Sequence, residues 1–118
     1  MQPFEQLLVW QKAHAVAVAL FHASTPWREF ELRAQLRRCA ASVPANIAEG
    51  AGTDSPGLFA RYLSHAQASA SELRYHLRYA HDVGMIDATE FSGYDTRVQE
   101  VRRMLHALTL RIRQRAKP

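Results

Sequence analysis

The chain has 118 residues, the length of one domain, and we expect a single domain over residues 1–118. It is 47% hydrophobic with only five Gly and five Pro, which excludes a turn-rich β-sandwich and a disordered chain and favours long helices. The single cysteine, Cys39, excludes a disulfide framework and a cysteine zinc site. Because no apolar run reaches the ~18 residues of a membrane span and no signal peptide pattern is present, we expect a cytoplasmic protein without membrane contact.

A first helix is predicted over residues 5–23, ending before the Ser24-Thr25-Pro26 turn. Six of its residues follow i, i+3, i+4 spacing and therefore share one face: Trp10, Ala13, His14, Ala17, Leu20 and Phe21. We place Val9 and Val16 on the flank of this stripe. His14, on the stripe, is expected to be a hydrogen-bonded interior histidine rather than a metal ligand.

A second helix is predicted over residues 29–49, closing at Gly50 and Gly52. Its apolar stripe consists of Leu32, Leu36, Cys39, Val43 and Ile47. A thiol in such a stripe acts as a small hydrophobe.

The third helix is predicted to begin at Asp54 or Ser55, with Pro56 in its first turn, and to end at Gly84. Its narrow stripe is Phe59, Tyr62, Leu63, Ala66, Leu73, Leu77 and Ala80. The fourth helix begins near Asp87, where Glu90 completes a capping box, and buries Val98, Val101, Leu105, Leu108 and Ile112. Four helices with short connections predict an all-α, antiparallel up-down-up-down four-helix bundle.

The most unusual segment is the run from Ser42 to Gly50 in the second helix, because it contains Pro44. An interior proline removes a backbone donor and crowds the carbonyl of Ala40, at a cost of ~3 kcal/mol. Ser42 and Asn46 carry short polar side chains that can bond backbone groups near such a distortion. We interpret the segment as a structural kink with a polar seam, and we keep a ligand site as the alternative.

Asn46 and Glu49 border the apolar stripe, so we expect both to be largely buried and hydrogen-bonded. Glu49 lies near a helix C-terminus, where a negative charge is unfavourable. We therefore expect an arginine or several backbone amides to contact it.

Three segments resemble a known family: Leu8-Val9-Trp10-Gln11-Lys12-Ala13, Gln35-Leu36-Arg37-Arg38, and Ser42-x-Pro44-x-Asn46-Ile47-Ala48-Glu49-Gly50. Together with Ala66-x-Ala68-Ser69-x-x-Glu72-Leu73 they resemble the four-helix-bundle proteins encoded in intervening sequences of 23S ribosomal RNA genes. The resemblance implies an antiparallel bundle that assembles with itself, with a homopentamer favoured. A related branch is the accessory protein of diversity-generating retroelements, which implies RNA or DNA and a reverse transcriptase as partners.

Two surfaces of the chain suit such roles. From Arg97 onward seven basic residues stand against one acid, Glu100, and six of them are the arginines we expect to contact nucleic acid: Arg97, Arg102, Arg103, Arg111, Arg113 and Arg115. Tyr75 and Tyr79 lie opposite the apolar stripe of the third helix, and exposed tyrosines are typical of interfaces between proteins. We expect this pair at an oligomer interface.

The sequence contains little that supports an enzymatic function. No nucleophile elbow or phosphate-binding glycine loop is present, and the Glu-x-x-His pattern of di-iron bundles is missing. We find no paired acids at ligand spacing beside three further histidines, His65, His76 and His81. We therefore expect no enzyme, cofactor or metal, and predict an oligomeric nucleic-acid-binding adaptor; the alternative is an assembly module that does not bind nucleic acid.

Overall fold

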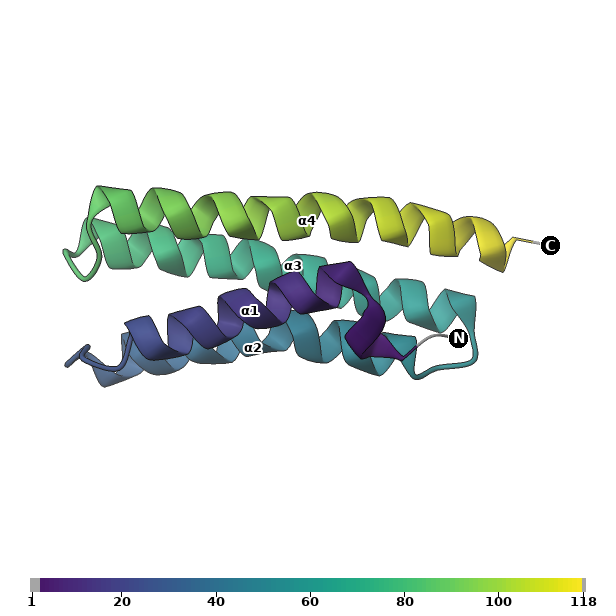
Figure 1. The fold of residues 1–118 in the computed structure, drawn as a ribbon, viewed down its shortest axis with the longest axis horizontal. Coiled ribbons are helices and arrows are strands. Elements are labelled where there is room, and N and C mark those ends of the chain that lie inside the picture. The colour runs from purple at the N-terminus through teal and green to yellow at the C-terminus, as the bar shows by residue number, and fades with distance from the viewer. Residues whose placement is uncertain (1–2, 118) are drawn as a thin grey trace.

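The computed structural model describes residues 3–117, which form four α-helices that alternate in direction and pack side by side (Figure 1). A short 3-10 turn, η1 (Phe4–Gln6), precedes them. The helices are α1 (Leu8–Ala23), α2 (Phe30–Ala51), α3 (Pro56–Asp82) and α4 (Ala88–Ala116). The predicted up-down-up-down bundle is confirmed, as a rod of 51 × 21 × 19 Å. None of the helices in the described part of the chain is both long and apolar enough to cross a membrane.

The ends of α3 and α4 follow the predicted capping chemistry. Ser55 caps α3 by accepting a hydrogen bond from the backbone amide of Leu58 at 3.2 Å. At the start of α4, the Asp87 carboxylate accepts from the amide of Glu90, and the Glu90 carboxylate accepts from the amide of Asp87. These bonds satisfy amide groups that have no partner inside a helix. Gly84 lies in the α3–α4 connection, directly after the C-cap Val83, and has a φ of +85°, a conformation that favours glycine.

The predicted stripes of α2, α3 and α4 lie in the core, but that of α1 is rotated. Its buried residues are Val9, Ala13, Val16 and Leu20. Phe21 is exposed, and His14 is exposed with its ring stacked on Trp10 at 4.7 Å. The expectation of an interior His14 was therefore wrong. The aromatic rings of α1 misled the sequence interpretation, because they pack on one another at the surface while the small aliphatic residues meet the other helices.

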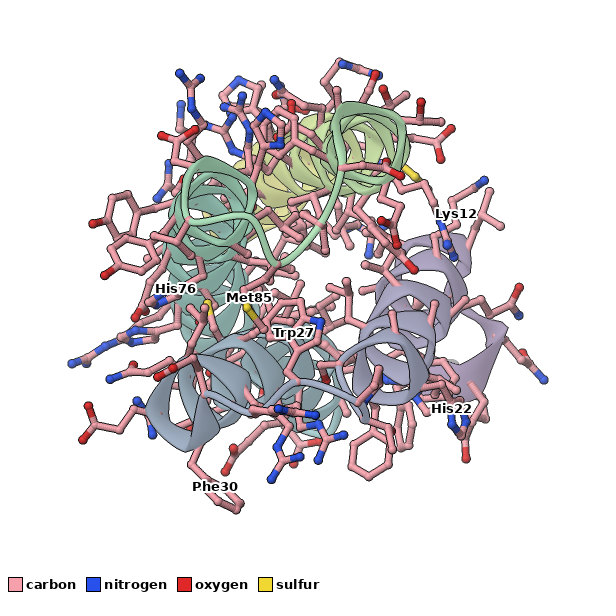
Figure 2. The ribbon with its side chains drawn as sticks, turned by 90° about the vertical axis from the view of Figure 1, so that its left-hand side faces the viewer. Lys12, His22, Trp27, Phe30, His76 and Met85 are labelled. Atoms are coloured by element: carbon pink, nitrogen blue, oxygen red, sulfur yellow. The ribbon has the colours of Figure 1, made fainter. Side chains whose placement is uncertain are left out.

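Buried side chains and the hydrogen bonds of one arginine hold the α1–α2 connection in place. Trp27 is buried and points, like Met85, into the space between the helices at this end of the bundle (Figure 2). The Arg37 guanidinium donates to the Phe21 carbonyl at 2.8 Å and to the hydroxyl of the buried Ser24 at 2.9 Å, and it lies 3.8 Å above the Phe21 ring. One side chain of α2 thus holds the C-terminal end of α1.

At Gly50, α2 and α3 pack closely together. A Cβ atom at this position would lie 2.8 Å from both Phe59 Cδ1 and Tyr62 Cβ. Gly50 is inside α2, which continues to Ala51 and ends at Gly52. Of the two glycines predicted to close the helix, Gly52 is its C-cap, so that part of the prediction is confirmed, and the part that concerns Gly50 was wrong. The function of Gly50 in the fold is to let two helices pack without a side chain between them.

Candidate nucleic-acid interface

The six arginines of α4 proposed for nucleic acid do not form one surface. Helical spacing places Arg102 and Arg113 on one face and Arg97, Arg111 and Arg115 on another. Arg102 and Arg113 border α3, since they line grooves together with α3 residues. Arg97 lines a groove with α1 residues. The structure thus separates residues that the sequence interpretation treated as one group.

Part of the surface between α3 and α4 is basic, whereas nearer the start of α4 the Arg74–Asp95 ion pair, at 2.8 Å, joins the same two helices. Two adjoining grooves on it are lined by four arginines, two histidines, two glutamines and a serine, with two small residues: Gly57, Ala60, Arg61, Ser64, His65, Gln67, Gln99, Arg102, Arg103, His106 and Arg113. None of these lining residues is acidic. Seen along the bundle axis, nitrogen-rich side chains gather along this side (Figure 2). We call this surface the α3–α4 basic groove.

Two interhelical hydrogen bonds fix the floor of the groove. Gln67 donates its side-chain amide to the Thr109 hydroxyl at 3.0 Å, and that buried hydroxyl donates to the carbonyl of Leu105 at 2.7 Å. Arg113 donates to the Ser64 hydroxyl at 3.3 Å, which holds its guanidinium across the groove. Polar residues of this kind join α3 to α4 without neutralising the arginines.

The other side of α4 is electrically mixed. Lys12 of α1 and Glu100 of α4 form an ion pair at 3.1 Å beside Arg97. Such a partly exposed pair contributes little stability, but it places a carboxylate where a phosphate would have to approach. This side is therefore less suited to a polyanion than the α3–α4 basic groove.

The sequence interpretation missed the part that α3 contributes to the groove. Arg61 and His65 are four residues apart and His106 is four residues after Arg102, so helical spacing alone places each pair on one side of its helix. The spacing does not show that this side of α3 lies next to this side of α4. That pairing depends on how α3 and α4 rotate about their axes when they pack.

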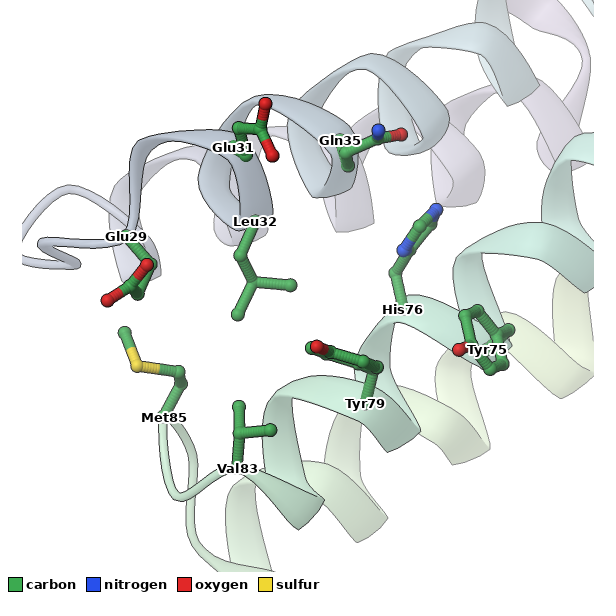
Figure 3. Close-up of a pocket in the computed structure, with 9 residues that line it drawn as sticks. All are labelled: Glu29, Glu31, Leu32, Gln35, Tyr75, His76, Tyr79, Val83 and Met85. Atoms are coloured by element: carbon green, nitrogen blue, oxygen red, sulfur yellow. The ribbon is translucent and has the colours of Figure 1, made fainter.

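Tyr75 and Tyr79 are exposed, as predicted, with ring centroids 6.1 Å apart. Both line a groove between the C-terminal part of α3 and the N-terminal part of α2 (Figure 3). The remaining lining residues are Glu29, Glu31, Leu32, Gln35, His76, Val83 and Met85. The surface is therefore aromatic and apolar with an acidic rim, in contrast to the α3–α4 basic groove.

The Ser42–Gly50 segment joins α2 to α3. The Ser42 hydroxyl lies 2.8 Å from the Ser69 hydroxyl of α3, and the half-buried Asn46 donates to both the Ser42 carbonyl at 2.8 Å and the Ser42 hydroxyl at 3.1 Å. Pro44 is buried in the same turn. Asn46 thus bonds the carbonyl of Ser42, and not that of Ala40, which the proline crowds.

Glu49 does not fit its prediction. It is exposed, and its carboxylate has no hydrogen bond or ion pair among the residues that the structure describes. The predicted burial was wrong because Glu49 follows the buried Ile47 by two residues, which turns it by about 200° to the outer face of the helix.

Replacing Asn46 by alanine is expected to lower the free energy of unfolding by ~1 kcal/mol, because two side-chain hydrogen bonds are lost at a half-buried site. Thermal unfolding followed by circular dichroism measures this change. Glu49→Ala is the matched control, and its effect should stay within about 0.5 kcal/mol because the side chain contacts solvent. An Asn46→Ala protein with the melting temperature of the parent would show that the bonds do not stabilise the fold.

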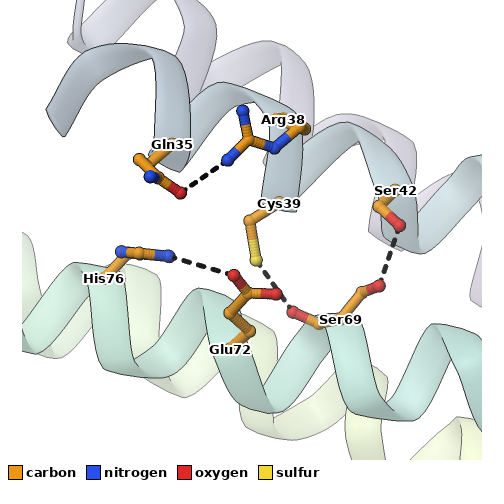
Figure 4. A network of polar contacts seen from close by, with 7 residues as sticks. All are labelled: Gln35, Arg38, Cys39, Ser42, Ser69, Glu72 and His76. Atoms are coloured by element: carbon orange, nitrogen blue, oxygen red, sulfur yellow. Dashed lines mark hydrogen bonds and ion pairs between the residues drawn. The ribbon is translucent and has the colours of Figure 1, made fainter. Parts of the chain in front are cut away.

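A second polar cluster, Cys39, Glu72 and His76, lies between α2 and α3, near the groove of the tyrosines (Figure 4). His76 Nε2 is 3.3 Å from a Glu72 carboxylate oxygen, and the buried Cys39 thiol donates to the Ser69 carbonyl at 3.1 Å. Burial, and after it the charge of Glu72, raises the pKa of Cys39 to about 12, against the opposing effect of Arg38. His76 does have an acid at ligand spacing, namely Glu72 four residues earlier, so the contrary judgement from the sequence was wrong.

Comparison with known proteins now bears on this geometry. The family model of the 23S rRNA-intervening sequence protein matches residues 5–107. The chain belongs to this family. The match covers the tyrosine groove, the Ser42–Gly50 segment and most of the basic groove, and it confirms the resemblance seen in the sequence. The end of α4, with Arg111, Arg113 and Arg115, lies beyond it.

A solved structure supports the family fold. A crystal structure of a protein with unknown function from the S23 ribosomal protein family of Bacteroides thetaiotaomicron superposes with a TM-score of 0.81. The two chains are 23% identical, over 86% of this chain and 98% of that one. At this identity the likeness shows a shared fold. A comparison with curated proteins finds no match.

Proposed function

We propose that this member of the 23S rRNA-intervening sequence family is a non-enzymatic adaptor that binds RNA or DNA along the α3–α4 basic groove. The observation that supports it is the composition of the groove: four arginines, two histidines and no acid among its lining residues. Arginine binds phosphate with a planar set of donors, and the side-chain amides beside it can bond sugar and phosphate oxygens. A phosphate backbone lying between two helices would meet these donors in succession.

Of the six α4 arginines, we assign the contacts to Arg102, Arg103 and Arg113, and add Arg61 of α3. Arg97 lies next to the Lys12–Glu100 pair, and by helical spacing Arg111 and Arg115 share its side of α4. The family resemblance implies a relation to the accessory protein of diversity-generating retroelements, and this relation supports nucleic acid and a reverse transcriptase as partners of this adaptor.

The expected result of a salt titration is steep weakening of binding to random-sequence RNA and DNA. Replacing Arg102 and Arg113 together by glutamine should lower the slope of log K against log salt by about 2 on duplex DNA, since each lost phosphate contact contributes ~0.9. Fluorescence anisotropy at several salt concentrations measures this slope.

The matched control is Arg97→Gln with Arg115→Gln, which removes the same charge from the other side of α4. We expect its slope to remain that of the parent. Equal losses in both double variants would show that net charge, and not the groove, carries binding. Absence of binding at low salt in the parent protein would refute the proposal.

The second candidate function is a self-assembling module that does not touch nucleic acid. The exposed Tyr75, Tyr79 and Val83 favour it, because they place aromatic and apolar surface together on one groove. This assembly also fits the adaptor, in which several copies would bring several basic grooves to one nucleic acid. A homopentamer is the form that the family resemblance favours.

Tyr75→Ala combined with Tyr79→Ala is expected to reduce the oligomeric state and to leave the helical content unchanged, since neither ring belongs to the core. Sedimentation velocity and far-ultraviolet circular dichroism measure the two properties. Phe30→Ala, at another exposed ring outside this groove, serves as the control. A parent protein that is monomeric at micromolar concentration, or a double variant that assembles normally, would remove the tyrosines from the interface.

A further inference from the structure

Three different metal-ligating side chains meet between α2 and α3. Cys39 of α2 faces Glu72 and His76 of α3, and one potential ligand atom of each lies within 4.8 Å of those of the other two (Figure 4). Glu72 and His76 are one helical turn apart, so both side chains leave the same face of α3. Helix bundles build metal sites from side chains on facing helices, and here two ligands would come from α3 and the third from α2.

From this arrangement we infer that the chain holds a single Zn²⁺ ion through Cys39, Glu72 and His76. In a tetrahedral zinc site the bonds are about 2.0–2.3 Å long, which separates ligand atoms by roughly 3.5 Å. The 3.3 Å between the Glu72 oxygen and His76 Nε2 already has this value. The two separations that involve Cys39, to Glu72 and to His76, are at most 4.8 Å and need to close by up to about 1.3 Å. Small rotations of both the Glu72 and the His76 side chains would supply this movement.

The donor set favours zinc over the harder divalent cations. A thiolate with an imidazole suits Zn²⁺ and poorly suits Mg²⁺ or Ca²⁺, which prefer oxygen ligands. Binding would release the thiol proton of Cys39, because a coordinated cysteine is deprotonated. The thiolate and the Glu72 carboxylate then balance the charge of the ion, beside the positive charge of Arg38.

The fourth position of the ion would face solvent. His76 also lines the tyrosine groove, and the Glu72 side chain is 59% exposed. A site with three protein ligands and one open position binds a water or a small anion there, unlike a closed structural site with four protein ligands. The site would also link α2 to α3 near the middle of the bundle. The inference is independent of nucleic-acid binding, since none of these residues lines the basic groove.

Cobalt substitution tests the site on the full-length, chelator-treated protein. We expect Co²⁺ to bind with one equivalent per chain and to give a thiolate-to-metal charge-transfer band in the near ultraviolet, which added Zn²⁺ abolishes. Cys39→Ser should remove this band. His76→Gln and Glu72→Gln should each weaken Co²⁺ binding by at least the ~10–100-fold that loss of an outer-shell partner costs.

The controls are His106→Gln and Glu49→Gln, which alter a histidine and an acid outside the cluster and should leave the titration unchanged. Glu72 is exposed and His76 half-buried, so their variants remain informative if Cys39→Ser fails to fold. No charge-transfer band in the parent protein at millimolar Co²⁺ would overturn the inference. So would a band that persists with unchanged affinity in both His76→Gln and Glu72→Gln, because it would indicate binding by the thiol alone.

Discussion

Gly50→Ala is expected to lower the free energy of unfolding by about 2 kcal/mol, although alanine is the better helix former. The new methyl group would lie 2.8 Å from Phe59 Cδ1 and from Tyr62 Cβ. Phe59 is buried and a Cβ atom cannot move without its backbone, so α2 and α3 must separate. Overpacking of this kind costs about 1–3 kcal/mol and occasionally more, and the gain of ~1 kcal/mol in helix propensity offsets only part of it.

Gly93→Ala provides the matched control for this prediction. Gly93 also lies inside a helix, α4, but a Cβ atom there would contact nothing within 4 Å. The same substitution should therefore raise the free energy of unfolding by ~1 kcal/mol. Urea unfolding of the two variants measures effects of opposite sign. A Gly50→Ala protein as stable as Gly93→Ala would show that the two helices are not in close contact at this point.

Arg37→Ala is expected to lower the free energy of unfolding by about 2 kcal/mol. The guanidinium donates to the Phe21 carbonyl, to Ser24 and to the hydroxyl of Thr25, and it stacks on the Phe21 ring. Hydrogen bonds from a charged donor contribute ~1.5–3 kcal/mol, and partial exposure to solvent reduces that contribution. The clamp holds the C-terminal end of α1 together with the Ser24 and Thr25 hydroxyls, which also donate to the Phe21 carbonyl, each at 3.1 Å.

Arg37→Lys distinguishes this clamp from a simple charge effect. Lysine keeps the charge but lacks the planar set of donors that reaches several acceptors at once. We expect it to recover less than half of the lost stability. Arg38→Ala is the control, since Arg38 donates to the Gln35 side chain at 2.6 Å on the surface of the same helix. Full recovery by lysine would show that charge alone stabilises this end of the bundle.

The bundle itself was predictable because its local signals agree with one another. Ser55, Asp87 and Glu90 are capping residues at the observed helix starts, and the stripe of α4 contains one aliphatic residue at nearly every core position. In α1 the sequence pattern did not show which face lies in the core, because aromatic and aliphatic residues follow two overlapping helical stripes. Composition cannot decide between them; the choice depends on the shape of the space that α2 and α4 leave.

The surfaces were less predictable than the core. Arg102 and Arg113 could be recognised as basic residues of α4, but their joining with Arg61 of α3 depends on helix rotation. The Cys39–Glu72–His76 cluster was missed for a related reason. The sequence was searched for the Glu-x-x-His pattern, in which two ligands lie three residues apart on each helix. In this cluster Glu72 and His76 lie four residues apart on α3, and the third residue, Cys39, comes from α2.

The short connections between the helices influence the order in which the bundle assembles. Residues 24–29, 52–55 and 83–87 join helices that are neighbours both in sequence and in space, so most native contacts close small loops. Such local topologies fold in microseconds to milliseconds. Among the described residues, the pairing of α1 with α4, which includes Lys12 and Glu100, joins distant parts of the chain and pays the larger loop-closure entropy. We therefore expect these contacts to form late in folding. Contacts that form after the rate-limiting barrier mainly slow unfolding, so this seam is expected to set how long a folded molecule persists rather than how quickly it forms.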